Sequence, residues 1–463
     1  MKKTKQSEPL NEFLEMNRRR KPVSFHMPGH KYGRFPYGKK AHEFASFDIT
    51  EIPDADNIQK PNGIIKKSLE MISEAYGSDK TIFITNGATG GILAIMKYFS
   101  QSGGRVIVSR DCHSSVVNGA ILFNVSLEFI PVQYNDGIPL PVTADAVKKA
   151  VDAVKECSGV IITSPNYYGL VASIGEIGSF LKSRNILLAV DEAHGAHFAF
   201  SGLGEFSGLN NGADIVCHSL HKTMPVYNQG ALLHIKGNSV DDEKLCGIVR
   251  MLGTSSPSYP ILASMEKAVA YYRQHGTELY RKLAVLVEIT RMNLLKKGFK
   301  CLPNDDFSRL VIDVSAKNAN GYRMFERLCE SGVYLEACDS RYLTAITTPS
   351  NRKRDFIALE RAIGYANMDL VNDAEGPFLN ASWQLPQKAM DIHEAILCDR
   401  HPVPMDRAAG SICGTIIIPY PPGVPCLYPG EVITGETALH IKTIVDGGGV
   451  VLGLDRGMIP VLE

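Results

Sequence analysis

The 463-residue sequence has no excess of charge of either sign and no long hydrophobic run. Lysine plus arginine and aspartate plus glutamate number 49 each, which gives a formal net charge of zero. Such a chain lacks the basic surface that binds nucleic acid or an anionic membrane, so a small-molecule partner is favoured. The charged N-terminus has no apolar core of a secretory signal, and no later run of about 18 apolar residues could span a bilayer. We therefore expect a cytoplasmic protein.

Cysteine is infrequent, and the ten cysteines stand without regular spacing. This pattern is typical of free thiols in a reducing compartment rather than of a disulfide framework. No pair of cysteine and histidine motifs stands at the spacing of a zinc site. His194 and His197 could bind a metal together with Asp191, but the intervening Gly195 disfavours rigid placement of the ligands. We expect no metal.

The length exceeds what one hydrophobic core usually organises, so two packed domains are expected. We assign an N-terminal segment to residues 1–60, a large domain to residues 61–275 and a smaller C-terminal α+β domain to residues 276–463. In the smaller domain, helices are expected at residues 277–297, at 321–331 and through 361. Strands are expected there at residues 310–314, 333–337 and 342–346.

The large domain is expected to be α/β, because short β-branched runs alternate with segments of helical periodicity. Most of the runs are apolar on both faces, as in a parallel sheet covered by helices on both sides. The link between the last two runs is too short for a crossover helix, so one strand should be reversed. We therefore predict a mostly parallel, seven-stranded sheet. Its strands are TIFIT (81–85), RVIVS (105–109), LEFIPV (127–132), GVIITS (159–164), ILLAVDEA (186–193), DIVCHS (214–219) and GALLHI (230–235).

Polar motifs stand at the ends of several of these strands, where ligands bind in open α/β sheets. TNGATGG (85–91) places small residues at a helix start, so that backbone N–H groups can approach an anion, although a plain glycine-rich turn is the alternative. SRDCHSS (109–115) places His113 at a strand end, where a core or capping histidine is the plainer interpretation. Asp191 ends an apolar strand and must be paired or hydrogen-bonded there.

HSLHKTM (218–224) places Lys222 directly after a strand, with few compensating acids nearby. Desolvation and neighbouring positive charge would lower the pKa of this amine and make it nucleophilic, although a lysine that only extends to solvent is the alternative. Together with the anion cradle and the buried acid, the lysine suits pyridoxal phosphate. Lys222 would hold the aldehyde as a Schiff base, Asp191 the pyridine nitrogen, and the turn from Gly87 to Thr89 with Ser219 the phosphate.

Through these residues the sequence resembles the Orn/Lys/Arg decarboxylase family of fold-type I pyridoxal phosphate enzymes, over nearly its whole length. The resemblance implies α-decarboxylation of a basic amino acid in polyamine biosynthesis, with arginine ahead of lysine or ornithine. The N-terminal wing of the large family members is missing, so the chain resembles the shorter form. Further matching motifs are HMPGHK (26–31), DITEIPDADNI (48–58), TSSPSYPILAS (254–264) and PPGVPCLYPGE (421–431).

By position, the resemblance makes Lys222 the Schiff-base lysine, Asp191 the partner of the pyridine nitrogen, His221 a neighbour at the reacting face and His113 the ring-stacking histidine. Lys222 or His221 is the candidate acid that reprotonates the α-carbon. Further residues are implied by the resemblance in three roles. Those near the cofactor are Gly87, Ala88, Thr89, Ser219, Ala193 and His194; those that reach the phosphate of a neighbouring subunit in a homodimer or larger oligomer are Ser255 and Ser256; those near the substrate are His194, Glu431, Glu336 and Asp339.

Two departures from the family pattern concern substrate choice, namely Ala88 in place of a hydroxyl and the residues Val226, Tyr227 and Asn228 after the lysine. An aminotransferase or lyase on the same scaffold is an alternative, with an arginine in the small domain to bind the substrate carboxylate. Candidates for that arginine are Arg309, Arg341 and Arg352. A catalytically silent regulatory homologue is a further alternative, but the retention of lysine, aspartate and histidine together argues against it.

Overall fold

A computed structural model describes residues 7–20, 23–24, 27–28, 30–32, 45–317, 319–370, 385–420 and 424–463. The chain divides into two units, and each is built from two separate stretches. The first unit comprises Met1–Tyr98 and Leu187–Glu278, and the second comprises Phe99–Ile186 and Leu279–Glu463. The domain boundaries expected at residues 60 and 275 stay predictions. Parts of the HMPGHK and PPGVPCLYPGE motifs lie outside the described residues.

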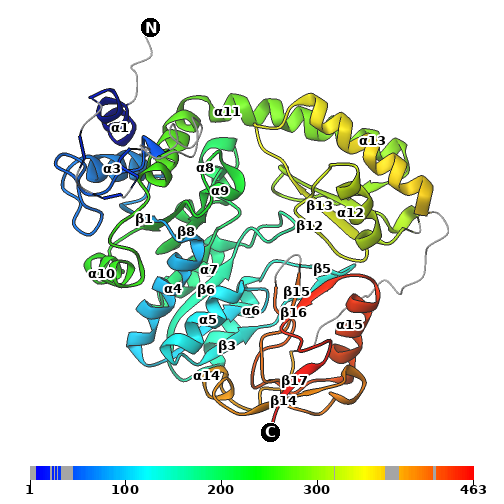
Figure 1. The fold of residues 1–463 in the computed structure, drawn as a ribbon. Helices are drawn as coiled ribbons and strands as arrows, with labels where there is room; N and C mark the ends of the chain where they lie inside the picture. The colour runs from blue at the N-terminus through cyan, green and yellow to red at the C-terminus, as the bar shows by residue number, and fades with distance from the viewer. Residues whose placement is uncertain are drawn as a thin grey trace. The chain divides into compact units, whose positions relative to one another are not determined.

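A seven-stranded sheet has the strand order β1-β9-β8-β7-β6-β2-β3, and Figure 1 labels four of its strands, β1, β8, β6 and β3. β9 pairs antiparallel with both β1 and β8, whereas β2 is parallel to β3 and β6, and β7 to β8. The predicted α/β fold class, all seven strands and the reversed strand are therefore confirmed. The bounds are β1 Lys80–Ile84, β2 Arg105–Ser109, β3 Leu127–Ile130, β6 Cys157–Thr163, β7 Leu188–Asp191, β8 Ile215–Ser219 and β9 Ala231–Ile235.

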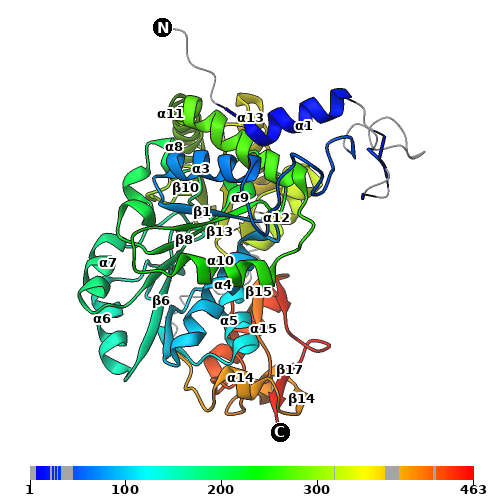
Figure 2. The same ribbon diagram turned by 90° about the vertical axis from the view of Figure 1, so that its left-hand side faces the viewer.

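Buried or partly buried carboxylates bind the free N–H groups at the start of two helices of the first unit, α1 and α3. Figures 1 and 2 show α1 beside α11, and the contact is specific, because the buried carboxylate of Glu266 on α11 accepts from the backbone N–H groups of Leu10 (3.1 Å) and Asn11 (2.9 Å). The helices with residues in this unit are α1 Pro9–Arg20, α3 Ile64–Tyr76, α4 Gly87–Phe99, α8 Phe198–Ser201, α9 Leu220–Thr223, α10 Asp242–Leu252 and α11 Tyr259–Lys296. The helix expected at 277–297 thus begins 18 residues earlier than predicted, at Tyr259 (277 − 259 = 18).

Asp56, from the DITEIPDADNI motif, binds the start of α3 through its side chain. One carboxylate oxygen accepts from the N–H groups of Gly63 (2.7 Å) and Ile65 (2.9 Å), and the other from that of Asn62 (3.0 Å). Partial burial acts to raise the pKa of Asp56, but these N–H donors outweigh it and lower the pKa.

Replacing Asp56 with alanine is expected to lower the free energy of unfolding by about 1–2 kcal/mol at neutral pH, because α3 loses its cap. Since the folded-state pKa is lowered, the contribution is fully present above the unfolded pKa and disappears as the pH falls through the folded value, so wild type and variant should converge in acid. Urea unfolding at several pH values measures this. Asp56→Asn, which keeps one acceptor oxygen, should lose less. A constant difference between wild type and Asp56→Ala down to acid pH would contradict the assignment.

The second unit carries, besides its strands of the large sheet, a four-stranded sheet of order β10-β11-β13-β12. Its core joins Leu310 and Ile312 of β11 to Leu343 of β13 and to residues of helices α12 and α13. The strand expected at 333–337 is wrong for most of its length, because β12 pairs with β13 only at its two residues and Tyr334 is exposed. The bounds are β10 Lys300–Cys301, β11 Arg309–Asp313, β12 Ala337–Cys338, β13 Tyr342–Ile346, α12 Gly321–Glu330 and α13 Lys353–Leu370.

The C-terminal part of the second unit forms a further small core around Ile417, Leu427, Ile441 and Val461. No helix of the described residues is long and apolar enough to cross a membrane. The remaining elements of the second unit are α5 Ser114–Phe123, β4 Tyr134–Asn135, β5 Ile138–Pro139, α6 Ala144–Ala153, α7 Ile174–Ser183, α14 Ile392–Ala395, β14 Arg400–Val403, β15 Ile418–Tyr420, α15 Gly435–Asp446, β16 Val450–Leu452 and β17 Ile459–Leu462.

Candidate active site

Lys222 lies on α9, the single helical turn that comes directly after β8. Its side chain is half-buried, and its Nζ donates to Nε2 of His194 at 3.1 Å. This contact requires an unprotonated Nε2, so the proton of a neutral His194 stands on Nδ1. His194 is buried in the turn after β7. The structure thus brings together two of the predicted site residues from neighbouring strand ends.

Asp191 is the last residue of β7 and is paired in register with Cys217 of β8. One of its carboxylate oxygens accepts from the N–H of Ala193 at 3.2 Å. The pKa of the Cys217 thiol is raised well above its usual value by burial and by the charge of Asp191, whereas Lys222 acts to lower it. Both charged groups therefore lie close to one thiol. Acid and lysine thus stand at the carboxyl ends of neighbouring parallel strands, as the carboxyl-end rule predicts.

The first turn of α4 approaches this edge closely, because small residues stand at the contact. A Cβ at Gly91 would lie only 2.6 Å from Sγ of Cys217, and that thiol donates to the carbonyl of Ala88 at 3.6 Å. Gly87, with a φ of +75°, donates its N–H to the carbonyl of Gln229 at 3.0 Å. Because an α-helix does not use the N–H groups of its first turn, those of Ala88 and Thr89 are available in geometry to an anion.

Ser219 and His221 flank Leu220 at the end of β8. Nδ1 of His221 lies 3.3 Å from the carbonyl oxygen of Gly230 and 3.4 Å from Oγ of the buried Ser219. Since the carbonyl can only accept, Nδ1 of His221 carries the proton and donates it. Nε2 of a neutral His221 is then the basic nitrogen, which suits a group that takes up or returns a proton.

His113 belongs to the second unit, where it caps α5. Its Nδ1 accepts from the N–H of Ser115 at 3.2 Å. A neutral His113 therefore carries its proton on Nε2. Its assignment as the residue that stacks on the cofactor ring stays a prediction. Ser255 and Ser256, in the first unit, are exposed, as residues that reach a neighbouring subunit would have to be.

The three predicted substrate acids of the second unit have different surroundings. Glu336 is exposed. Asp339 accepts from the hydroxyl of Tyr168 at 2.9 Å and from the N–H of Tyr342 at 2.6 Å, and burial raises its pKa. Glu431 is buried, accepts from Nη2 of Arg110 at 2.9 Å, and its pKa is also raised by burial.

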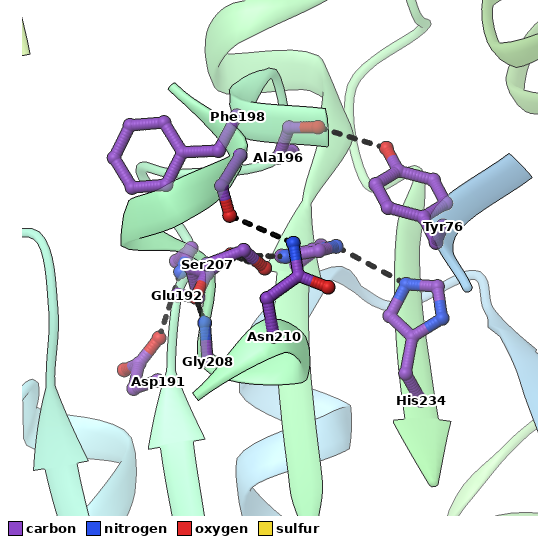
Figure 3. Close-up of polar contacts among 12 residues, drawn as sticks. Tyr76, Asp191, Glu192, Ala196, Phe198, Ser207, Gly208, Asn210 and His234 are labelled. Atoms are coloured by element: carbon purple, nitrogen blue, oxygen red, sulfur yellow. Dashed lines mark hydrogen bonds and ion pairs between the residues drawn. The ribbon is translucent and has the colours of Figure 1, made fainter. Parts of the chain in front are cut away.

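Sequence reasoning missed the residues that support these groups. Arg110 pairs with Glu431, and its guanidinium carbon lies 3.9 Å from the ring centroid of Tyr428. In the first unit, Glu192, His218 and His234 form a buried chain of hydrogen bonds, drawn in Figure 3. The available signal was alternation, because Glu192 and His218 directly adjoin Asp191 and Ser219 and so point to the opposite face.

The groups found in the first unit fit pyridoxal phosphate. The set comprises a half-buried lysine amine, a buried carboxylate at the end of the neighbouring strand, a hydroxyl at Ser219 and the N–H groups at the start of α4, which match an aldehyde, a ring nitrogen and a phosphate. In the described part of the chain, no three histidine, cysteine, aspartate or glutamate side chains are grouped as metal ligands.

Comparison with known proteins first defines the class of fold. The chain superimposes on a structure of Sphingomonas wittichii serine palmitoyltransferase with a TM-score of 0.54 at 16% identity, over 66% of this chain and 76% of that one. It superimposes on the constitutive lysine decarboxylase of Escherichia coli with a TM-score of 0.82 at 21% identity, over 99% of this chain and 82% of that one. Both likenesses concern the fold, which is that of fold-type I pyridoxal phosphate enzymes.

Sequence profiles then identify the family. The profile of the Orn/Lys/Arg decarboxylase major domain matches residues 8–337, and that of the Orn/Lys/Arg decarboxylase C-terminal domain matches residues 379–445. The chain belongs to this family of pyridoxal-phosphate-dependent carboxy-lyases, and pyridoxal phosphate is its cofactor. YaaO, an uncharacterized protein of Bacillus subtilis, is 30% identical over 94% of each chain. An arginine decarboxylase of the same organism is 28% identical over 96% of this chain and 95% of that one.

Proposed function

We propose that the protein decarboxylates arginine to agmatine and carbon dioxide. The observation that supports this most directly is the placement of Lys222 beside His194, with the charges of Lys222 and Asp191 both close to Cys217. The choice of arginine rests on relatives. Relatives named arginine decarboxylase, matched over nearly their whole length, are 27–29% identical to this chain. The constitutive lysine decarboxylase of Escherichia coli is 23% identical, and the match covers 73% of that longer chain.

Each site residue has a distinct task in this proposal. Bound pyridoxal phosphate supplies an electron sink for the pair released when the bond between Cα and the carboxylate breaks. Lys222 would bind the aldehyde carbon through Nζ, and Asp191 would keep the ring nitrogen protonated. The N–H groups of Ala88 and Thr89, with the hydroxyl of Ser219, would hold the phosphate by charge-assisted hydrogen bonds.

Proton transfer is assigned to the two histidines near the lysine. His194 accepts from the Lys222 amine, so it can take a proton from Nζ when the amine must become nucleophilic. His221, with Nε2 as its basic nitrogen, or Lys222 itself would return a proton to the α-carbon after carbon dioxide leaves. His113 would cover one face of the ring. For the distal guanidinium, the candidates are the acids of the second unit described above.

A side-by-side assay with arginine, lysine and ornithine tests the substrate assignment. Released carbon dioxide and the amine product are measured for each, at equal substrate concentration and with added pyridoxal phosphate. We expect agmatine from arginine, and a kcat/KM for lysine and ornithine that is lower by about tenfold or more, because a carboxylate placed to match the fork of a guanidinium binds an ammonium less well. Equal or higher turnover of lysine would reassign the substrate.

The aminotransferase alternative has little support in the structure. Arg341 is held by Asp313 at 2.8 Å, Arg309 is fully buried, and Arg352 is exposed. A decarboxylase releases one carbon dioxide per amine formed, whereas an aminotransferase would yield an oxo acid and no carbon dioxide.

The oligomeric state is also part of the proposal. We propose a homodimer in which Ser255 and Ser256 reach across the interface, and sedimentation of the holoenzyme tests it.

A further inference from the structure

A chain of buried polar side chains crosses the large sheet next to the candidate site residues (Figure 3). Glu192 comes directly after β7, His218 and His234 lie on β8 and β9, and none of the three exposes more than 1% of its surface. Nε2 of His218 lies 2.9 Å from Oε1 of Glu192, and Nδ1 of His218 lies 3.1 Å from Nε2 of His234. The chain continues to Thr81 on β1, whose hydroxyl lies 2.9 Å from Nδ1 of His234.

The hydrogen bonds of this chain point in one direction. Oε1 of Glu192 also accepts from the hydroxyl of Ser207 (3.0 Å), and Oε2 accepts from the N–H of Gly208 (2.6 Å), as an ionised carboxylate does. His218 therefore donates from Nε2. Burial and the neighbouring His218 lower the pKa of His234 well below its usual value, so His234 is neutral. It donates from Nε2 to His218 and accepts from Thr81.

Tyr76 joins this chain to both segments that come after the site residues. Its hydroxyl donates to the carbonyl of Ala196 at 2.9 Å and contacts Sδ of Met224 at 3.5 Å. Ala196 stands five residues after Asp191, and Met224 two residues after Lys222. The Tyr76 ring lies against His218 and His234, with centroids 5.0 and 4.7 Å apart. The Tyr76 side chain thus contacts both the turn after Asp191 and the turn after Lys222.

The backbone is shaped to admit the Glu192 side chain. A Cβ at Gly195 would lie 2.6 Å from Cγ of Glu192, and a Cβ at Gly208 would lie 3.2 Å from its Oε2. Glu192 also donates its N–H to the carbonyl of Cys217. Gly195 is therefore required because a side chain there would collide with Glu192. The Glu192 side chain in this way fixes the path of the turn that carries His194.

We propose that Glu192, His218, His234 and Tyr76 are positioning residues for Asp191 and Lys222. The inference rests on the proposed function, in which Lys222 is released from the cofactor whenever a substrate amine takes its place. At that stage no covalent bond to the cofactor holds Lys222 in place, so the side chains around the turn after β8 must keep it within reach of the aldehyde carbon. A displacement of about 1 Å is enough to slow a reaction by up to about a hundredfold.

Two variants test the proposal against a matched control. Glu192→Gln keeps the size of the side chain, and the two imidazoles can reverse their donor direction to accommodate it. Tyr76→Phe removes only the hydroxyl that bonds to Ala196. Glu266→Gln is the control, because Glu266 is an equally buried carboxylate of the same unit that holds the start of α1. For each purified holoenzyme, the thermal midpoint, the Kd for pyridoxal phosphate, and kcat and KM for arginine are measured.

If these residues position Asp191 and Lys222, the variants should change the Kd for pyridoxal phosphate and kcat but leave KM nearly constant. Glu192→Gln should raise the Kd for pyridoxal phosphate by about tenfold and lower kcat by about tenfold, with KM within about twofold. Tyr76→Phe should change Kd and kcat in the same direction by about threefold. Glu266→Gln should lower only the thermal midpoint.

The inference would be overturned if Glu192→Gln and Tyr76→Phe gave the same Kd and kcat as Glu266→Gln. The chain of hydrogen bonds would then serve stability alone. If Glu192→Gln does not fold, Tyr76→Phe decides by the same comparison. A wild-type protein that forms no lysine-linked complex with pyridoxal phosphate would instead refute the proposed function, and this inference with it.

Discussion

Replacing Lys222 with alanine is expected to abolish the covalent complex with pyridoxal phosphate and to lower kcat for decarboxylation by about 10³-fold or more. The reason is that the variant loses the amine that lies beside His194. The thermal midpoint of the apoprotein should change little, because the lysine is only half-buried. Visible absorption of the bound cofactor and release of carbon dioxide are the measurements.

Reduction with borohydride gives an independent test of the same assignment. The reagent fixes the cofactor to the lysine that carries it, and peptide mass spectrometry then identifies the residue. Lys236→Ala is a suitable control, because Lys236 stands directly after β9 in the same unit but pairs with Asp79 at 3.7 Å. It should retain labelling and activity. Label on any lysine other than Lys222, or undiminished activity of Lys222→Ala, would refute the proposed site.

The largest effect on stability is expected at Arg110. Replacing it with methionine should lower the free energy of unfolding by about 3–5 kcal/mol, because Glu431 would be left buried without its cation. The pair has an N···O distance of 2.9 Å, and the guanidinium also contacts the Tyr428 ring. Replacing both partners, as Arg110→Met with Glu431→Leu, should restore much of the loss. Urea unfolding of the single and double variants measures the coupling between them.

The pH dependence of the Arg110→Met variant is determined by Glu431. Burial already raises the pKa of this carboxyl in the folded protein, and loss of Arg110 removes the main opposing influence. A raised folded-state pKa favours the protonated form, so stability is retained at low pH and lost as the pH rises through the folded pKa. The free energy of unfolding of the variant should therefore approach that of the wild type in mild acid.

The exposed pair of Arg105 and Glu128, at 3.4 Å, is the control for the Arg110 variant. Arg105→Met should lower the free energy of unfolding by less than about 1 kcal/mol.

The same residue bears on substrate recognition. If Glu431 also holds the distal group of arginine, Glu431→Gln will lower kcat/KM for arginine by about tenfold or more while the cofactor remains bound. An unchanged kcat/KM would leave Glu431 with the structural role that its pairing with Arg110 already indicates. Glu336 and Asp339 would then be the acids to test next.

The strands and the end positions of Asp191 and Lys222 were predictable, because both depend on local properties. Runs of β-branched residues without polar interruption mark buried strands, and the carboxyl-end rule places the residues after each strand at one edge of the sheet. The contact between Lys222 and His194 was not predictable, since it depends on the path of the turn around Glu192 and Gly195. The strand expected at residues 333–337 failed for a related reason: strand propensity does not supply a partner, and β13 pairs only with the two residues of β12.

The contacts of the buried chain around His218 could not be predicted from the motif that contains it. The HSLHKTM motif indicated no role for His218, and only the alternation along β8 turns it to the other face, towards Glu192. The supporting residues Arg110 and Tyr428 were equally hidden, because 318 positions separate them in the sequence. Contacts of such separation arise from the tertiary fold and leave no local periodicity.

The interleaved composition of the two units has a consequence for synthesis on the ribosome. The first unit needs both Met1–Tyr98 and Leu187–Glu278, so β1 must wait for β9, its antiparallel partner, to be translated. The nascent β1 therefore remains without its partner strand while residues 85–230 are made, which include the stretch 99–186 of the second unit. Helices α3 and α4 can form early from local contacts, but the edge that carries Asp191 and Lys222 is completed late, and truncated chains ending before β9 should be prone to aggregation.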